Sequence, residues 1–367
     1  MPIRVLLVED SPLAQVILTR ILSSSDWIEV VGVACNGLEA LTMLPELDPQ
    51  VICTDLHMPY MDGLAMTVEV MARYPRPILV VSASVQDDDA QHIFELLAAG
   101  AVDILPKPTA GLSDDDQTLN KMLIDKIRVL AGVKVFRRKP KQRLLPEPSF
   151  NLPSASPSTA SPATAFSPSL PAKLKKKITI IAIGASTGGP QALCTVFKAL
   201  PKRCPPVLCV QHISTGFLQG LIDWLQRGCT LSISIAQAGQ PPLPGHIYFP
   251  KEDCHLAVDR SGLFTYLDSP PVGGHRPSIT VTFEAIAQHY GPYAVGVLLT
   301  GMGQDGASGL QSIAQAGGLT IAQNEATSVI FGMPKVAIEL GAAAHVLPIE
   351  AIAPALRQFV QAFDLLS

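Results

Sequence analysis

The sequence predicts two open α/β domains, each built on a doubly wound parallel sheet, joined by a long linker. Short apolar runs alternate with helical patterns over residues 1–133, and the same alternation returns over 178–367. Strands separated by helices in this way are typical of βα units and a parallel sheet. Between the two stretches, proline, serine and alanine dominate. We therefore place the domains at 1–133 and 177–367 and the linker at 134–176.

The expected strands are β-branched runs, and the segments between them have helical periodicity. In the first domain the strands include IRVLLV, VICTD, ILVVSA and AVDILP, with helices in LAQVILTRIL, GLAMTVEVMARY and AQHIFELLAAG. In the second they include ITIIAI, PVLCVQ, YAVGVLL, GLTIAQ and AHVLPI. The stretch HIYFPKEDCHLAVDRSGLFTYL has short strands and turns, which indicates an antiparallel hairpin inserted in the second sheet.

The linker has few large apolar side chains and almost no acidic ones. Residues 134–172 carry 6 Lys and Arg against 1 Glu. A segment of this composition buries too little surface to offset its chain entropy, so we expect a disordered, partly extended tether.

Charge and composition exclude several classes of protein. Residues 1–133 hold 8 basic and 19 acidic residues, and residues 173–367 hold 13 and 11. An acidic first domain and a near-neutral second one argue against nucleic acid as a partner. No apolar run reaches the ~20 residues of a membrane helix, and the start MPIRVLLVED lacks a signal-peptide pattern. The seven scattered cysteines form no zinc or disulfide pattern, so we expect a cytoplasmic protein without membrane insertion.

Polar residues follow the predicted strands of the first domain. Glu9 and Asp10 end the first strand, Asp55 ends VICTD, Ser82 closes VVS, and Lys107 follows AVDILP. Such strand ends share one edge of a parallel sheet, where ligands bind. Carboxylates gathered there require a hard cation, and Mg²⁺ fits because it takes carboxylate oxygens and water. An aspartate beside Mg²⁺, lysine and a hydroxyl can accept a phosphoryl group.

These residues make the segment similar to a two-component receiver domain, with a flavodoxin-like fold. The resemblance implies that Asp55 is the phospho-acceptor. It also implies that Asp10 and Asp55 bind Mg²⁺, helped by Glu9 and the backbone carbonyl of His57, and that Ser82 and Lys107 contact the phosphoryl oxygens. Many receivers have an aromatic switch residue three positions before the lysine, whereas this chain has Ile104.

The second domain opens on a glycine-rich turn, Gly184-Ala185-Ser186-Thr187-Gly188, between a strand and a helix. The turn matches neither GxGxxG nor a P-loop. It contains G-x-S-x-G, the pattern of a nucleophile elbow, in which the helix N-terminus offers N–H groups to an oxyanion. The alternatives are an anion cradle for a nucleotide, or a hydroxyl of Ser186 or Thr187 that only caps the helix.

A base and a carboxylate favour the nucleophile. His212 ends the strand PVLCVQ, and Asp305 lies in the loop after YAVGVLLTG, while His275 in GGHRPS is a second candidate base. A hydroxyl, an imidazole and a carboxylate at three strand ends are the set that acyl transfer needs. The chain order Ser, His, Asp differs from that of α/β-hydrolases, so the scaffold is a different one.

The second domain resembles the catalytic domain of the chemotaxis protein-glutamate methylesterases, the CheB family, with a Rossmann-like fold. The resemblance rests on IGASTGGP, VQHI, LPGHIYFP, GHRPS, VGVLLTGMGQDGASG, AQNEAT and FGMPKVA. It implies that Ser186 is the nucleophile, His212 the general base and acid, and Asp305 the group that orients His212. Thr187, His275 and Met302 would line the site.

The resemblance implies a phosphorylation-regulated enzyme that demethylates glutamate γ-methyl esters on chemoreceptor helices and deamidates particular receptor glutamines. It implies a chemotaxis histidine kinase as phosphodonor and no cofactor in the catalytic domain. A DNA-binding response regulator would end in a compact basic helix-turn-helix instead, which the long strand-rich second domain argues against. A nucleotide-binding domain would leave His212 and Asp305 without a role.

Overall fold

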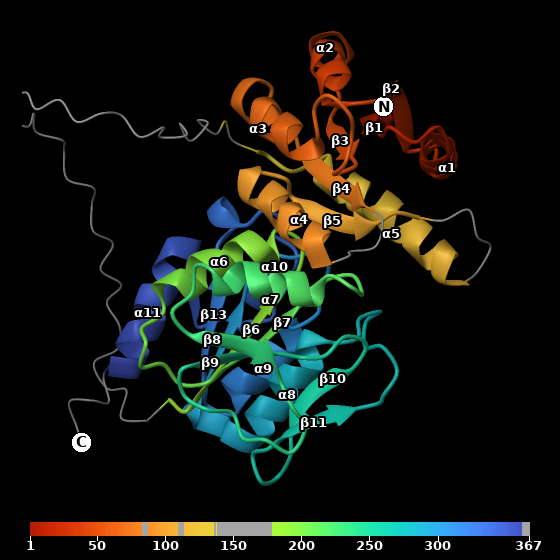
Figure 1. The fold of residues 1–367 in the computed structure, drawn as a ribbon. Helices are drawn as coiled ribbons and strands as arrows, with labels where there is room; N and C mark the ends of the chain where they lie inside the picture. The colour runs from red at the N-terminus through yellow and green to blue at the C-terminus, as the bar shows by residue number, and fades with distance from the viewer. Residues whose placement is uncertain (83–86, 109–113, 136, 138–177, 362–367) are drawn as a thin grey trace, which may run out of the picture.

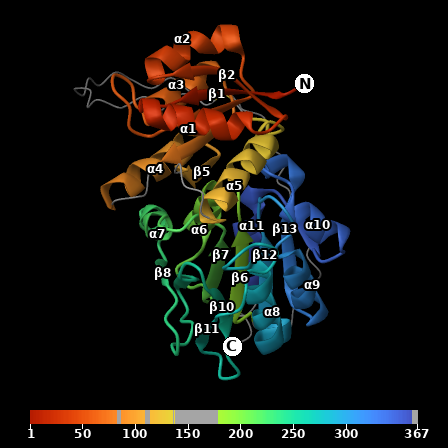
Figure 2. The same ribbon diagram turned by 90° about the vertical axis from the view of Figure 1, so that its right-hand side faces the viewer.

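The structure is a computed structural model that describes residues 1–82, 87–108, 114–135, 137 and 178–361. Nearly all of the predicted linker lies outside these described residues. Figures 1 and 2 show the N-terminal domain above the C-terminal one, with α4, β5 and α5 facing it.

The N-terminal domain is a five-stranded parallel sheet in the order β2-β1-β3-β4-β5. Its strands are β1 (Ile3–Val8), β2 (Ile28–Ala34), β3 (Val51–Thr54), β4 (Ile78–Ser82) and β5 (Asp103–Pro106). Its helices are α1 (Pro12–Ser23), α2 (Gly37–Leu47), α3 (Gly63–Arg73), α4 (Asp87–Ala99) and α5 (Asp114–Leu130). This order is that of the flavodoxin-like fold, so the predicted fold class is confirmed.

Alternation along the strands gives this sheet two apolar faces. Leu6 and Val8 of β1 pack with α2, α3 and α4 on one face, while Val5 and Leu7 pack with α1 and α5 on the other. Helix starts follow the sequence because Ser11, Asn36 and Asp62 cap α1, α2 and α3 through their side chains.

The C-terminal domain is a seven-stranded parallel sheet in the order β14-β13-β12-β6-β7-β9-β8. Its strands are β6 (Ile180–Ala185), β7 (Val207–Gln211), β8 (Ser232–Ile235), β9 (His246–Phe249), β12 (Ala294–Leu298), β13 (Leu319–Gln323) and β14 (His345–Leu347). Its helices are α6 (Gly189–Ala199), α7 (Leu218–Gln226), α8 (Ile279–Tyr290), α9 (Ala307–Gln315), α10 (Met333–Glu339) and α11 (Ile349–Gln361), with short 3₁₀ turns η1 (Gly291–Tyr293) and η2 (Glu325–Thr327).

The predicted hairpin is present but lies outside the main sheet. β10 (His255–Val258) and β11 (Phe264–Leu267) form a separate two-stranded antiparallel sheet, whereas β9 joins the main sheet in parallel. The hairpin's apolar side chains Leu256, Val258 and Phe264 pack on α8 rather than extending the sheet.

The connections that lead away from β6 determine where a binding crevice forms at the edge of the sheet. After β6 the chain continues to β7 on one side, and it later returns to β12 on the other. A crevice forms at the carboxyl ends of strands where the winding reverses. The loops that follow β6, β7 and β12 therefore meet at one place.

Candidate active site

Ser186, His212 and Asp305 lie at this crevice. Ser186 and His212 directly follow β6 and β7, and Asp305 lies in the loop after β12. The His212 N–H donates to the Ala185 carbonyl at 3.0 Å, and the Ser186 N–H donates to the Thr300 carbonyl at 3.0 Å. The three residues that sequence reasoning selected thus follow adjacent strands, and backbone hydrogen bonds hold Ser186 and His212 in place.

The turn after β6 is sharp, and its hydroxyl groups do not cap α6. The N-cap of α6 is Gly188, at φ +75°, with no side-chain capping bond, and the Gly189 N–H donates to the Ser186 carbonyl at 2.7 Å. Glycine is needed at 188 because L side chains rarely adopt this φ. The alternative that Ser186 or Thr187 serves as the helix cap is therefore wrong.

Gln211 ties the two strand ends together, a role that its sequence position alone did not reveal. Its Nε2 donates to the carbonyls of Ser186 and His212, both at 2.8 Å. A side chain at Gly189 would overlap the Gln211 amide, which explains the second glycine of the turn.

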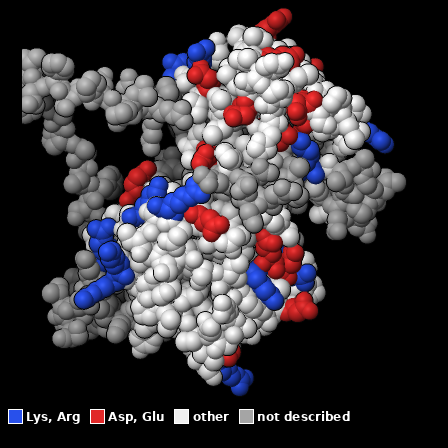
Figure 3. Space-filling view, viewed as in Figure 1, with Lys and Arg blue, Asp and Glu red and all other residues white. Residues whose placement is uncertain are grey.

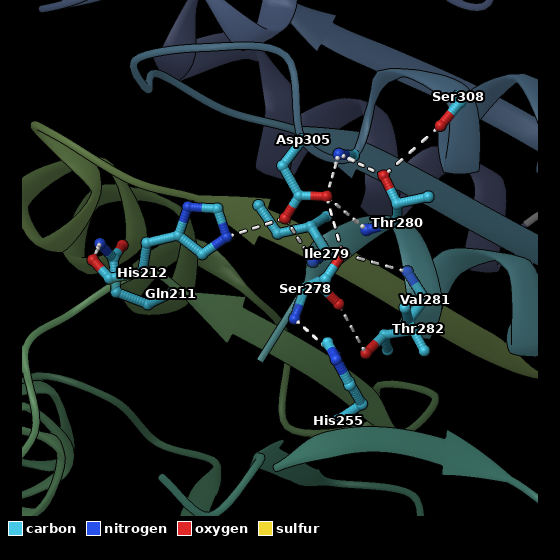
Figure 4. A network of polar contacts seen from close by, with 11 residues as sticks. Gln211, His212, His255, Ser278, Ile279, Thr280, Val281, Thr282, Asp305 and Ser308 are labelled. Carbon is cyan, nitrogen blue, oxygen red and sulfur yellow. Dashed lines mark hydrogen bonds and ion pairs between the residues drawn. The ribbon is translucent and has the colours of Figure 1, made fainter. Parts of the chain in front are cut away.

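Five donors surround the Asp305 carboxylate (Figure 4). Oδ1 accepts from Ser278 Oγ at 2.8 Å, Gly306 N at 2.9 Å and Thr280 N at 3.1 Å, and Oδ2 accepts from Ile279 N at 2.7 Å and His212 Nε2 at 2.9 Å. Ser278 is the N-cap of α8, so the carboxylate lies at a helix N-terminus, which favours its charge.

These donors keep Asp305 ionised. Burial alone would raise the pKa of Asp305, but the hydrogen bonds from His212, Ile279 and Ser278 and the charge of His212 hold that pKa far below its usual range. Ser278 and His255 behind it were not found from sequence. The Ser278 N–H donates to His255 Nδ1 at 3.0 Å, and His255 Nε2 contacts the Pro270 carbonyl at 3.2 Å.

The hydrogen bond to Asp305 fixes the role of each His212 nitrogen. Asp305 accepts from Nε2, so Nε2 carries the proton and Nδ1 keeps its lone pair. Nδ1 is buried and has no hydrogen-bond partner among the described residues. The Ser186 hydroxyl likewise makes no hydrogen bond to His212 in the described structure, a looseness common before substrate binds. Nδ1 is therefore the atom available to act as a base.

His275 stacks face to face on His212. Their ring centroids are 3.9 Å apart, and the rings are inclined by 9°. Burial, together with the charges of His212 and Lys126, lowers the pKa of His275 to about 4, although Asp305 opposes this. The neutral ring of His275 therefore supports His212 by packing on it rather than by transferring a proton.

The low pKa of His275 predicts a pH-dependent stability. The unfolded chain takes up this proton near pH 6.5 and the folded one near pH 4, so the unfolded state binds more protons between those values. Stability from this group is present above pH 6.5 and is lost as the pH falls toward 4, by about 2 kcal/mol at pH 5. Denaturant unfolding at pH 7.5 and 5.0 should show a larger loss for the wild type than for His275→Gln, and equal losses would contradict the assignment.

The loop after β12 approaches Ser186 closely at Gly301. A Cβ at Gly301 would lie 2.7 Å from the Ser186 Cβ and would overlap the Met333 sulfur. Met302 follows in this loop, half-buried. Its predicted place in the lining of the site stays a prediction, whereas Met333, which sequence reasoning missed, lies against Gly301 on the same side as Ser186.

A second cluster lies at the carboxyl edge of the N-terminal sheet. Carboxylate oxygens of Glu9, Asp10 and Asp55 lie within 4.8 Å of one another. Lys107 Nζ is 2.7 Å from Asp55 Oδ2 and 2.8 Å from Glu9 Oε2. Burial raises the pKa of Glu9 despite the hydrogen bond with Lys107. An oxygen cluster of this kind could bind a hard divalent cation.

The remaining predicted residues lie on or just after neighbouring strands of the same sheet. Ser82 is buried at the end of β4, and exposed His57 follows Asp55 by two positions. Ile104 lies inside β5 and is buried in a core cluster, so an aliphatic side chain fills the place of the aromatic switch.

The two domains pack tightly together. Phe94 of α4 stacks on Trp224 of α7 with centroids 5.8 Å apart. Gln191 of α6 donates through Nε2 to the carbonyls of Ala101 and Leu97, at 2.7 and 3.2 Å. One apolar cluster extends without interruption across both domains.

A polar contact reaches the residue next to Ser186. Thr187 Oγ1 donates to Asp103 Oδ2 at 2.7 Å, and Lys126 Nζ forms an ion pair with the same carboxylate and lies 3.4 Å from Thr187 Oγ1. Thr187 is 3% exposed. The N-terminal domain thus covers the turn that carries Ser186. On the side of the molecule seen in Figure 3, acidic side chains are spread over the surface of this domain.

Comparison with known proteins identifies two matching domain families. Residues 5–119 match the response regulator receiver domain, and residues 181–356 match CheB methylesterase. A solved catalytic domain of Thermotoga maritima CheB methylesterase is 36% identical, covering 50% of this chain and 98% of that one, with a TM-score of 0.49.

Curated relatives match the chain over nearly its whole length. A protein-glutamate methylesterase/protein-glutamine glutaminase of Nitrosospira multiformis is 40% identical, covering 98% of this chain and 97% of the relative. A protein of the same description from Salmonella choleraesuis is 37% identical, covering 95% of each. None of the helices in the described part of the chain is long and apolar enough to cross a bilayer.

Proposed function

Because this chain belongs to the family of protein-glutamate methylesterase/protein-glutamine glutaminase proteins, we propose that it hydrolyses γ-glutamyl methyl esters on chemoreceptor helices. It also deamidates particular receptor glutamines, and both reactions take place in the cytoplasm. The observation that carries the proposal is the oriented pair of His212 and ionised Asp305 beside Ser186.

The geometry supports a two-step acyl transfer. The Ser186 Oγ attacks the γ-carbonyl carbon, and His212 Nδ1 takes the hydroxyl proton. The imidazolium, stabilised by Asp305, returns this proton to the leaving methanol or ammonia as the bond to the carbonyl carbon breaks. Water then attacks the acyl-enzyme by the same route. A backbone N–H of the turn before α6 is the proposed donor to the oxyanion, because the Gly189 N–H already donates to the Ser186 carbonyl and Pro190 has none. One such donor is worth ~10²–10³-fold in rate.

Methanol and ammonia release test the chemistry separately. Receptor membranes labelled in the ester methyl group should release methanol, and receptor peptides with unmodified glutamine should release ammonia. Absence of both products with active receptor substrates would contradict the proposal.

The receiver domain is proposed to control this site through Asp55. Glu9, Asp10 and Asp55, with the His57 carbonyl, would hold Mg²⁺, which neutralises charge on the incoming phosphoryl group. A histidine kinase is the proposed donor, and Ser82 and Lys107 would contact the phosphoryl oxygens. The docked receiver is the inhibited state, since it contacts Thr187 directly.

β5 is placed to relay the signal. Lys107, which pairs with Asp55, follows the end of this strand, and Asp103, which accepts from Thr187, begins it. Phosphorylation that draws Lys107 toward the new oxygens can shift β5 and weaken the Asp103 contact. This route needs no aromatic side chain at Ile104. Asp55→Ala should remain at its basal rate when a phosphodonor is added.

Removing the Asp103 carboxylate should raise basal activity. Asp103→Ala deletes the acceptor for Thr187 and the partner of Lys126, and ~1.4 kcal/mol of lost docking energy gives a tenfold larger open population. The rate of methanol release by the full-length variant without phosphodonor measures this basal activity.

Asp125→Ala is the matched control, because Asp125 lies next to Lys126 on α5 but its one ion pair among the described residues is with Arg128, at 3.7 Å. An Asp103→Ala rate no higher than that of the control would argue that the contact does not inhibit.

A further inference from the structure

A recess beside the two stacked histidines has no role in the chemistry described above. It is small, with a volume of about 20 Å³, is partly open to solvent, and lies between the ends of β7 and β9 and the loop before α8. Gln211 lines it on one side and Arg276 on another. Gln211 binds the carbonyls of Ser186 and His212, and Arg276 directly follows His275. The recess therefore borders the reacting groups.

Arg276 is the charged group of the recess with the least satisfied side chain. Its Nε is buried and has no hydrogen-bond partner among the described residues. Its nearest described acid is Asp268, 3.6 Å from Nη1, and that carboxylate side chain is 98% exposed. An exposed pair of this kind contributes little, whereas a buried N–H without an acceptor is costly. The guanidinium is thus available to an incoming acceptor.

The other charged groups of the recess already have partners. Glu252 Oε1 accepts from the N–H groups of Gly216 and Leu218, at 2.8 and 3.2 Å, at the start of α7. Asp253 contacts Thr215 at 3.5 Å, and the Lys251 ammonium lies 4.7 Å from the centre of the Tyr266 ring. Two basic and two acidic side chains line the recess, so its formal net charge is zero. Selection of an acidic ligand must therefore come from the directed N–H donors of Arg276.

We propose that the recess is a carboxylate subsite, in which Arg276 binds a glutamate side chain one helical turn from the glutamyl ester under attack. This rests on the proposed function, and it names a specificity determinant for it. Arginine has only donors and matches a carboxylate in a two-pronged geometry. Side chains at i and i+4 lie on one face of a substrate helix. Each turnover of either reaction leaves a glutamate on the receptor helix, so the enzyme's own product supplies the ligand.

The subsite predicts that hydrolysis at one position speeds hydrolysis at the next. An ester with a glutamate one turn away should be a better substrate than the same ester with a glutamine there. A hydrogen-bonded charge pair of this kind commonly gives about a tenfold difference. The difference should fall as salt rises, because the recess is open to water.

Helical peptides with one glutamyl methyl ester and either Glu or Gln four residues away provide the test. The full-length protein is assayed with phosphodonor, and kcat/KM for methanol release is compared for the two peptides. The wild type should prefer the Glu peptide about tenfold, and Arg276→Gln should bring the ratio close to one. Arg260→Gln, which removes an exposed arginine from the β10–β11 turn of the same domain, should keep the wild-type ratio.

The outcomes separate this inference from the proposed function. Hydrolysis of both peptides at equal rates by the wild type would overturn the carboxylate subsite and leave the esterase intact. A preference that survives in Arg276→Gln would assign recognition to another group. Failure to hydrolyse either peptide, while receptor membranes release methanol, would reject these peptides as substrates, and the same comparison would then use receptors with Glu or Gln at that position.

Discussion

Replacing Ser186 by alanine is expected to abolish ester hydrolysis while the protein stays folded. The covalent step has no substitute nucleophile, and losses of about 10⁶-fold are typical for the serine of such a triad. The backbone of Ser186 supplies the structural contacts, through the Thr300, Gly189 and Gln211 hydrogen bonds. Its hydroxyl makes none with the described residues, so alanine should cost little stability. Methanol release and the denaturation midpoint measure the two effects.

Thr187→Ala is the matched control for Ser186. It removes the adjacent hydroxyl, which donates to Asp103 across the domain interface. This variant should keep its chemistry and show a raised basal rate. An active Ser186→Ala enzyme beside an inactive Thr187→Ala enzyme would reverse the assignment of the nucleophile.

The change Asp305→Asn should lower turnover by about 10⁴-fold, as loss of the orienting carboxylate does in similar triads. All five partners of Asp305 are donors, so an amide NH₂ must face a donor on either side. With its NH₂ toward His212, the amide selects the tautomer protonated on Nδ1, which cannot take the Ser186 proton. The same substitution leaves the Ile279 N–H without an acceptor and costs roughly 1–3 kcal/mol of stability.

The variant Ser278→Ala separates these two consequences. It removes the N-cap of α8 and one hydrogen bond to Asp305, at a cost of about 1 kcal/mol, but it keeps the carboxylate and the His212 tautomer. It should lose stability and retain most activity. Equal losses of turnover in Ser278→Ala and Asp305→Asn would mean that the carboxylate acts only through the fold.

The sequence was sufficient to predict which site residues lie together at the ends of the strands. Parallel sheets bring the residues after their strands to one edge, so Ser186, His212 and Asp305, and likewise Glu9, Asp55 and Lys107, could be grouped from their places after apolar runs. The two α/β folds followed from the same alternation.

Contacts that depend on distant side chains could not be predicted in this way. The strands of the hairpin β10–β11 have a sequence pattern that strands of the main sheet could also have. Their packing on α8 is what keeps the hairpin separate from that sheet. Gln211, Arg276 and Ser278 lie in the motifs VQHI and GHRPS, but the motifs do not show which groups these side chains contact. The Asp103–Thr187 contact joins residues 84 positions apart across a domain interface, which no local pattern encodes.

Methanol release from methylated chemoreceptor membranes by the full-length protein, with and without a small-molecule phosphodonor and Mg²⁺, tests the central claim most directly. The account predicts slow release by the wild type that rises about tenfold or more with phosphodonor, no such rise in Asp55→Ala, and no release by Ser186→Ala under either condition. Release that is equal with and without phosphodonor, or that persists in Ser186→Ala, would contradict a receiver-controlled serine esterase.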